Sequence, residues 1–157
     1  MARGDRKRIN RALGIINPWL ELFGLSQTYE ITLAVDNLEP VDTINSNSAA
    51  AMVKMNWPYR TATVVIDRFF SDMAKDQALE RCLLHEVMHI VLADLTEPLE
   101  DDYKALYKEM EGRFESCIDT ITVALMRMSY GDRFDGAFSL HDLYIRKEDG
   151  KKQDAKS

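Results

Sequence analysis

The stretch LLHEVMHIVL, residues 83–92, decides the fold of this chain. Its apolar residues point in nearly every direction around a helix, which is typical of a helix that is buried on most sides. Asp76 is a plausible N-cap, so the sequence predicts a buried helix from Asp76 to about Leu95. Within that helix His85 and His89 are four residues apart and therefore project from the same face.

Three segments before this helix have the composition of β-strands. Residues 29–35 alternate apolar and polar side chains and are rich in β-formers, which indicates a half-buried strand. Residues 51–57 and 62–67 are predicted to form two further strands, which are separated by a turn at Pro58-Tyr59. The sequence therefore predicts a sheet of three strands, or slightly more, ahead of the buried helix.

Helical periodicity marks two further segments. Residues 5–16 place apolar side chains on one side, and Asn17-Pro18 is expected to end that helix. After the histidines, a second set of apolar residues recurs at helical spacing: Leu106, Met110, Phe114, Cys117, Ile118, Ile121, Leu125 and Met128. Gly131 is a plausible C-terminal end for this helix. We expect an α+β fold in which this second long helix packs on the first.

Length and composition indicate one domain. The chain has 157 residues, 46% of them hydrophobic, which suffices for a core of its own. We expect this domain to span residues 1–147, followed by a flexible polar tail at residues 148–157. Cys82 and Cys117 lie in apolar helical patterns, so buried, reduced thiols are expected rather than a disulfide.

Charge and hydropathy exclude several classes of function. The net charge of -6 disfavours broad attraction to nucleic acid or to an anionic membrane surface. No signal peptide or membrane-spanning apolar run is visible, so we expect a cytoplasmic location without a membrane partner. Five basic residues near the N-terminus indicate a solvated helix face or a small arm for nucleic acid; they are Arg3, Arg6, Lys7, Arg8 and Arg11.

The two histidines and the glutamate that follows the first have the spacing of a zinc site. Imidazoles four residues apart on a helix can reach one tetrahedral cation. Glu86 is rotated by about 100° from His85, where it can deprotonate a metal-bound water as a general base. Burying these three polar side chains in an apolar helix is costly without a charged partner. The sequence therefore predicts one Zn2+ ion, with Glu86 as the catalytic residue.

A catalytic zinc site also needs a third protein ligand and an open position. Glu115 and Asp119 flank the apolar stripe of the second helix four residues apart, so both can face the histidines. We expect Glu115 to bind zinc and Asp119 to orient a ligating imidazole. His141 and Asp94 are alternatives for the third ligand, and His141 ranks higher because Asp94 continues an uninterrupted helix.

The position of Glu115 poses a geometric problem. A helix that ends near Leu95 rises only about 9 Å beyond His89, whereas Glu115 lies 14 residues beyond Asp101. A simple antiparallel pair of helices would then carry Glu115 past the metal. We therefore expect residues 98–111 to form a separate helix or overhang, with a break at Gly112.

The pattern His85-Glu86-x-x-His89 followed by Glu115-x-x-x-Asp119 resembles the zinc signature of the gluzincin metallopeptidases, of which thermolysin is the familiar member. The resemblance implies two histidine ligands, a general base, a glutamate ligand and a supporting aspartate. The layout of residues 29–130 is similar to that of the minimal zincin-like peptidases of phages and mobile elements, including those that trigger repressor cleavage. A deformylase is disfavoured because the glycine-cysteine-leucine segment that supplies its third ligand is missing.

The resemblance also implies how substrate is bound. In such peptidases the last strand before the motif helix pairs with the substrate backbone, which here assigns that task to Thr63, Val64, Val65 and Ile66. An additional donor is expected to stabilise the oxyanion. The candidates after the second helix are His141, Tyr130 and Tyr144.

Together these features predict a cytoplasmic zinc-dependent metallohydrolase, most simply a peptidase that acts on a protein or peptide. The alternative is a catalytically weak zinc-bound module that binds peptides or regulates transcription by contacting a repressor. The glutamate at position 86 argues against a purely structural site, which needs no base.

Overall fold

The computed structural model describes residues 3–38 and 50–134, so the predicted tail at residues 148–157 lies outside the described residues. The described chain is an α+β fold with a small mixed sheet and long helices. Its elements are α1 (Arg3–Leu22), α2 (Leu25–Thr28), β1 (Glu30–Asp36), β2 (Ala51–Asn56), η1 (Trp57–Tyr59), β3 (Thr61–Asp67), α3 (Arg68–Met73), α4 (Asp76–Asp102), α5 (Lys104–Tyr130) and η2 (Gly131–Arg133). The three predicted strands are confirmed, each to within one residue of its expected bounds.

The sheet has the order β1-β3-β2, so β3 is the central strand. β1 runs parallel to β3, and β2 runs antiparallel to it. Leu33, Val53 and Val64 are in register; Val64 belongs to the apolar core, and the other two pack against it. On the opposite face the hydroxyls of Thr32, which is exposed, and Thr63, which is half-buried, share a hydrogen bond of 3.0 Å. One face of the sheet therefore packs on helices, whereas the other combines these threonines with the buried side chain of Val65.

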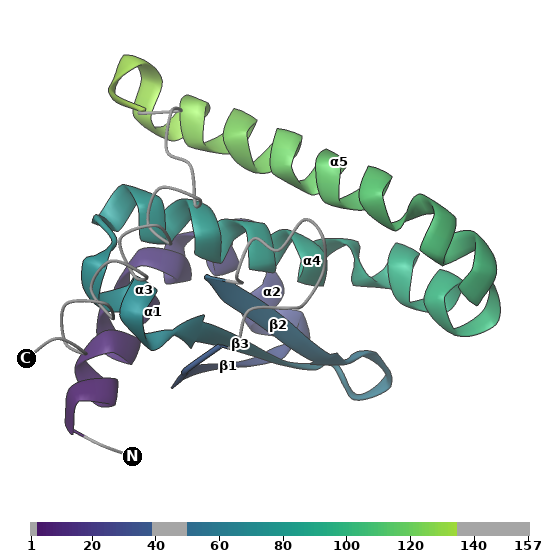
Figure 1. Cartoon of the computed structure of the whole chain (residues 1–157), viewed down its shortest axis with the longest axis horizontal. Coiled ribbons are helices and arrows are strands. Elements are labelled where there is room, and N and C mark those ends of the chain that lie inside the picture. Colours follow the sequence, from purple (N-terminus) through teal and green to yellow (C-terminus); the bar gives the residue numbers. More distant parts are fainter. Residues whose placement is uncertain (1–2, 39–49, 135–157) are drawn as a thin grey trace, which may run out of the picture.

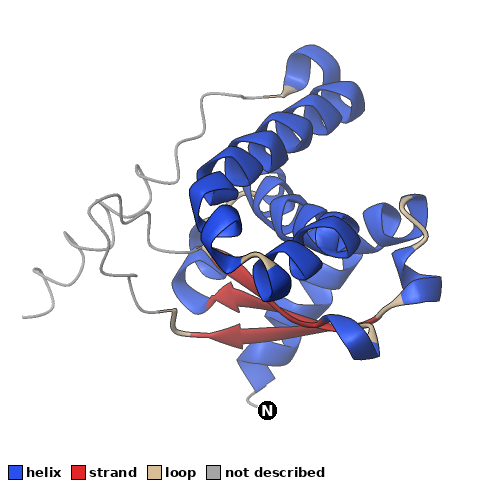
Figure 2. Ribbon diagram, turned by 90° about the vertical axis from the view of Figure 1, so that its right-hand side faces the viewer, coloured by secondary structure: helices blue, strands red, loops and turns tan. Residues whose placement is uncertain are grey.

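The helices form two further levels beyond the sheet. In Figure 1, α1 and α2 lie behind the strands, α4 packs on β2 and α1, and α5 lies along the outer side of α4. Figure 2 shows the same α4–α5 pair to one side of the strand layer. Fully buried side chains such as Ile16, Ile66 and Leu79 join α1, β3 and α4. As a result, α4 lies between the sheet and α5, and it carries the histidine motif.

None of the described helices combines the length and apolarity needed to cross a membrane.

Two prolines lie inside long helices. α1 continues through Pro18 to Leu22, and α4 continues through Pro98 to Asp102. The predicted helix ends at Asn17 and near Leu95 are therefore wrong. An interior proline costs about 3 kcal/mol, but in α1 the apolar face continues past it, because Trp19 and Leu20 are buried. Tertiary burial offsets the local cost.

α4 and α5 form a simple antiparallel hairpin that turns at Tyr103. α5 runs without interruption through Gly112, so the predicted separate helix at residues 98–111 and the break at Gly112 are wrong. Tyr103 lies 14 residues after His89 and 12 before Glu115. Because each helix rises by 1.5 Å per residue, arms of nearly equal length bring these two residues to the same level. The long α4 removes the overshoot expected from a short one.

Two of the basic residues of α1, Arg8 and Arg11, are engaged within the protein. Arg8 binds both carboxylate oxygens of Asp72, at 2.8 and 2.7 Å, which holds the pKa of Asp72 below its usual range. Arg11 binds Asp76 at 2.6 Å and two backbone carbonyls at the end of α3. These contacts hold α1 against α3 and α4. They favour the interpretation of these residues as a helix face over that of an arm for nucleic acid.

A buried carboxylate joins the three long helices. Glu80 of α4 accepts hydrogen bonds from Trp19 Nε1 of α1, at 2.8 Å, and from the hydroxyl of Tyr130 of α5. The bond to Glu80, with burial, raises the pKa of Tyr130 to about 12. Because this pKa lies above the unfolded value of about 10, the contribution of Tyr130 to stability is present below pH 10 and is lost as the pH rises towards 12.

Replacing Glu80 with alanine is expected to lower the free energy of unfolding by about 3 kcal/mol, because two hydrogen bonds to a charged acceptor are lost. Tyr130→Phe removes one of them and should cost about half as much. Urea denaturation followed by circular dichroism measures both. A loss below about 0.5 kcal/mol for Glu80→Ala, as for an ordinary surface change, would contradict a structural role.

Candidate metal centre

Three potential ligands converge at the seam between α4 and α5. The Nε2 atoms of His85 and His89 are 3.3 Å apart. Glu115 places Oε2 at 3.3 Å from Nε2 of His85 and Oε1 at 3.5 Å from Nε2 of His89. Their side chains are 22%, 25% and 49% exposed, so a ligand can enter from solvent. The structure thus brings together the three predicted metal ligands.

The spacing of these atoms fits a zinc ion. Around a tetrahedral ion with bonds of about 2.0–2.1 Å, neighbouring ligand atoms lie about 3.3–3.4 Å apart. Two facing imidazole nitrogens at 3.3 Å have room for only one proton between them, whereas a shared cation can satisfy both lone pairs and the carboxylate. In the described parts of the chain, no other group of three or more His, Cys, Asp or Glu side chains converges in this way.

Asp119 lies behind His85. Its Oδ1 is 3.3 Å from Nδ1 of His85, and Nη2 of Arg81 is 4.0 Å from the same oxygen. A proton on Nδ1 that is directed at Asp119 leaves Nε2 of His85 free to face the metal position. The arrangement matches the supporting role predicted for Asp119.

Asp119→Ala is expected to weaken zinc binding by about 10- to 100-fold, because the imidazole loses the carboxylate that fixes its tautomer and orientation. Competition with a chromophoric chelator measures this affinity. The matched control is Glu109→Ala, which removes an exposed carboxylate from the same helix without touching the histidines. Equal losses in both variants would indicate a general charge effect and contradict the specific role of Asp119.

Glu86 points from α4 toward the sheet rather than toward α5. Glu86 is 8% exposed, and its carboxyl group lies near the backbone of Val53 in β2. Burial raises the pKa of Glu86 to about 7, and Glu115 adds to the rise, while His85 and the Val53 N–H oppose it. A carboxylate with a pKa near neutrality can both accept and return a proton.

The three ligands influence one another through charge. Burial disfavours protonation of His85, but its bond to Glu115 and the nearby carboxylates outweigh this and raise its pKa. The same bond lowers the pKa of Glu115. Burial lowers the pKa of His89, which Glu115 only partly offsets. Neutral imidazole and ionised carboxylate are the forms that bind metal, so His89 and Glu115 are biased towards binding.

Other predicted site residues lie elsewhere. Asp94 accepts from Trp57 Nε1 and pairs with Arg60 Nη1, both at 2.7 Å, so it fastens the β2–β3 turn to α4 and is not a metal ligand. Tyr130 binds Glu80 and lies 15 residues beyond Glu115, about 22 Å along the helix, so its predicted role at the oxyanion is wrong. His141 and Tyr144 lie outside the described residues.

The prediction that β3 pairs with substrate is wrong. Thr63, Val64, Val65 and Ile66 are paired with β1 on one side and with β2 on the other, so their backbone groups are already used. Within the described residues, the strand with a free edge beside Glu86 is β2. Strand order depends on contacts far apart in the chain, which the local sequence pattern does not encode.

Cys82 is buried in α4, as predicted, but Cys117 is exposed, so that part of the thiol prediction is wrong. α5 buries only a narrow stripe of Ile118, Thr122 and Met126 against the rest of the protein. Apolar residues on its other faces therefore remain at the surface.

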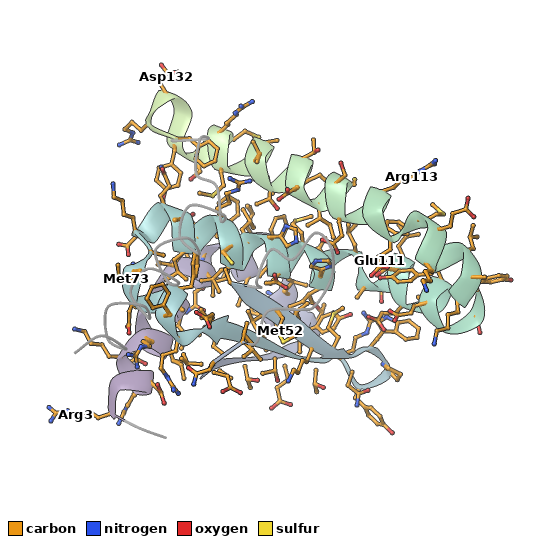
Figure 3. The ribbon with its side chains drawn as sticks, in the orientation of Figure 1. Arg3, Met52, Met73, Glu111, Arg113 and Asp132 are labelled. Atoms are coloured by element: carbon orange, nitrogen blue, oxygen red, sulfur yellow. The ribbon has the colours of Figure 1, made fainter. Side chains whose placement is uncertain are left out.

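Two features of the site were missed from the sequence. One is the proximity of Glu86 to the backbone of Val53 in β2, a contact that no residue pattern reveals. The other is Tyr107, which stacks on Phe114 with ring centroids 6.0 Å apart. Burial and the nearby carboxylates, Glu115 among them, raise the pKa of Tyr107. Figure 3 shows that Glu111 lies on the inner side of α5 and Arg113 on its outer side.

No protein family, curated protein or solved structure matched this chain. The functional assignment therefore depends on the chemistry of His85, Glu86, His89, Glu115 and Asp119.

Proposed function

We propose that this chain is a zinc-dependent metallohydrolase, most simply a peptidase with a zincin-like fold and a site of the gluzincin type. The observation that carries the proposal is the convergence of two imidazole nitrogens and a glutamate at 3.3–3.5 Å. The buried carboxylate of Glu86 beside them supports a catalytic site over a structural one, because a structural site needs no base.

Each residue has a role that follows from its position. His85, His89 and Glu115 would hold the ion, and Asp119 fixes the imidazole of His85. When bound, zinc supplies a Lewis acid that polarises the scissile carbonyl and acidifies water. Glu86 takes the proton from the attacking water and returns it to the leaving amine. These steps complete the hydrolysis of an amide bond.

The free edge of β2 supports a polypeptide substrate. The N–H of Asp67 donates to the carbonyl of Ala50 at 2.9 Å, which makes these two residues a hydrogen-bonded pair. Such pairs alternate with pairs whose backbone groups point outward, so Val53, three residues on, directs its N–H and C=O away from β3. An extended peptide can add to this edge next to Glu86.

The zinc-loaded protein is expected to hydrolyse fluorescently labelled casein, to stop when 1,10-phenanthroline removes the metal, and to resume when zinc is restored. Fluorescence release and mass spectrometry of the fragments measure the reaction. If chelation leaves the rate unchanged, the activity is not that of this centre. If one zinc is bound per chain but neither casein nor peptides are cut, the alternative of a peptide-binding module is favoured.

A further inference from the structure

A second cleft, of about 370 Å³, lies between α2, the β2–β3 turn and α4. This volume is within the usual range for small-molecule sites. Three apolar and three polar side chains supply its chemistry, namely Leu25, Ile90 and Val91 and Tyr29, Arg60 and Asp94. Asp94 is nine residues after His85, which is about two and a half helical turns, so their side chains project from opposite sides of α4. The helix α5, which carries Glu115, lies on the other side of α4 from α2 (Figure 1). The cleft is therefore separate from the candidate metal centre.

Arg60 uses only one of its side-chain nitrogens within the protein. Its Nη1 donates to the hydroxyl of Tyr29 at 2.9 Å and pairs with Oδ1 of Asp94 at 2.7 Å. Among the described residues, its Nε and Nη2 have no partner. These two N–H groups form the edge of a guanidinium that matches both oxygens of a carboxylate. Arg8 uses the same two atoms to bind Asp72, at 2.8 and 2.7 Å. The open edge of Arg60 therefore suits the carboxylate of a ligand.

Asp94 offers a complementary acceptor. Its Oδ1 is bound by Trp57 and by Arg60, whereas its Oδ2 has no partner within residues 3–38 and 50–134. The side chain of Asp94 is 63% exposed, so a ligand can reach this oxygen. Asp94 would repel a simple anion, and Arg60 would repel a simple cation. A ligand that carries both charges on neighbouring atoms matches the two open groups.

The backbone of Arg60 holds its side chain in position. Arg60 has a φ of 53°, in the left-handed region that glycine adopts more readily. Within the described parts of the chain, no other residue except glycine has a positive φ. Its guanidinium lies over the rings of Tyr29 and Trp57, 5.2 and 6.0 Å from their centroids. A strained conformation that fixes a charged side chain beside a cleft is typical of a binding site.

We propose that this cleft binds a free amino acid with an apolar side chain. The carboxylate of the ligand pairs with Nε and Nη2 of Arg60, and its ammonium group donates to Oδ2 of Asp94. Its side chain contacts Leu25, Ile90 and Val91. Neither charged contact involves the candidate metal ligands, so binding needs no zinc.

Leucine and two of its analogues test the proposal on the full-length wild-type chain. EDTA is present throughout, so that leucine has no zinc to bind. Leucine is expected to shift the amide resonances of Tyr29 and Val91 saturably, while that of Met126 in α5 stays in place. 4-Methylpentanoate lacks the ammonium group and 3-methylbutylamine lacks the carboxylate. Each should bind about tenfold or more weakly than leucine, as for a lost hydrogen bond to a charged group.

Two outcomes of this titration would overturn the proposal. One is the absence of a saturable shift with leucine. The other is an analogue that binds as tightly as leucine, because the contact to its missing charge would then not exist.

Arg60→Lys tests the guanidinium edge itself. Lysine keeps a positive charge beside Asp94 but cannot present two parallel N–H groups to a carboxylate, so leucine should bind about tenfold or more weakly. The matched control is Arg113→Lys, which makes the same change on the outer side of α5 and should bind leucine as wild type does. Equal affinity in Arg60→Lys and wild type would contradict the assigned contact. Circular dichroism monitors folding, and if Arg60→Lys does not fold, the analogue series in wild type decides.

Discussion

Replacing Glu115 with alanine is expected to weaken zinc binding by more than about 100-fold while the fold is retained. Removing a residue that only orients a ligand costs about 10- to 100-fold, and Glu115 contacts both histidines directly, at 3.3 and 3.5 Å. Its side chain is 49% exposed, so its loss should change stability little. Mass spectrometry of the native protein after dialysis measures the zinc content, and wild type should retain one ion per chain.

The control for this variant is Glu111→Ala, which removes a carboxylate one turn earlier on the same inner side of α5. It should retain zinc. If Glu115→Ala holds zinc as tightly as wild type, another residue completes the site, and His141 is the next to replace. A wild-type chain that binds no zinc would remove the basis for a metallohydrolase.

Glu86→Gln is expected to lower turnover by about 10²- to 10⁴-fold, which is the usual contribution of a positioned general base. Zinc content should not change, because the carboxylate of Glu86 faces Val53 and is not one of the three converging ligands. Hydrolysis of labelled casein and zinc analysis on the same preparations measure the two effects separately.

The matched control is Glu80→Gln, which neutralises another buried carboxylate of α4, one that is bound to Trp19 and Tyr130. It should keep its turnover at temperatures where it is folded. Loss of zinc in Glu86→Gln would make Glu86 a ligand rather than a base. Full activity in that variant would locate the base elsewhere.

The parts of the site that were predicted are those set by local helical geometry. Residues four apart on a helix share a face whatever the tertiary structure, so the pairing of His85 with His89 and of Glu115 with Asp119 follows from spacing alone. The three strands were also predictable, because alternation and β-branched residues act within short windows. In each case the signal and the structure involve the same few residues.

The errors concern contacts between distant segments. Alternation indicates which face of β3 is buried but not which strands flank it, so the central position of Thr63–Ile66 was not visible. Asn17-Pro18 was taken as a helix end because the local cost of an interior proline is clear, whereas the packing that offsets it is not. Because the end of α4 was predicted too early, a break at Gly112 was predicted that the structure does not need.

The hairpin turn at Tyr103 also determines how the chain can change in length. One residue inserted between Tyr103 and Glu115 would rotate Glu115 by about 100° and carry its carboxylate out of reach of the histidines. Seven residues added to each helix would complete almost two turns and leave the ligands nearly in phase. The far end of the hairpin can therefore be extended or shortened only in matched, near-integral numbers of turns. Homologous chains, if they share this centre, should differ there by such paired steps.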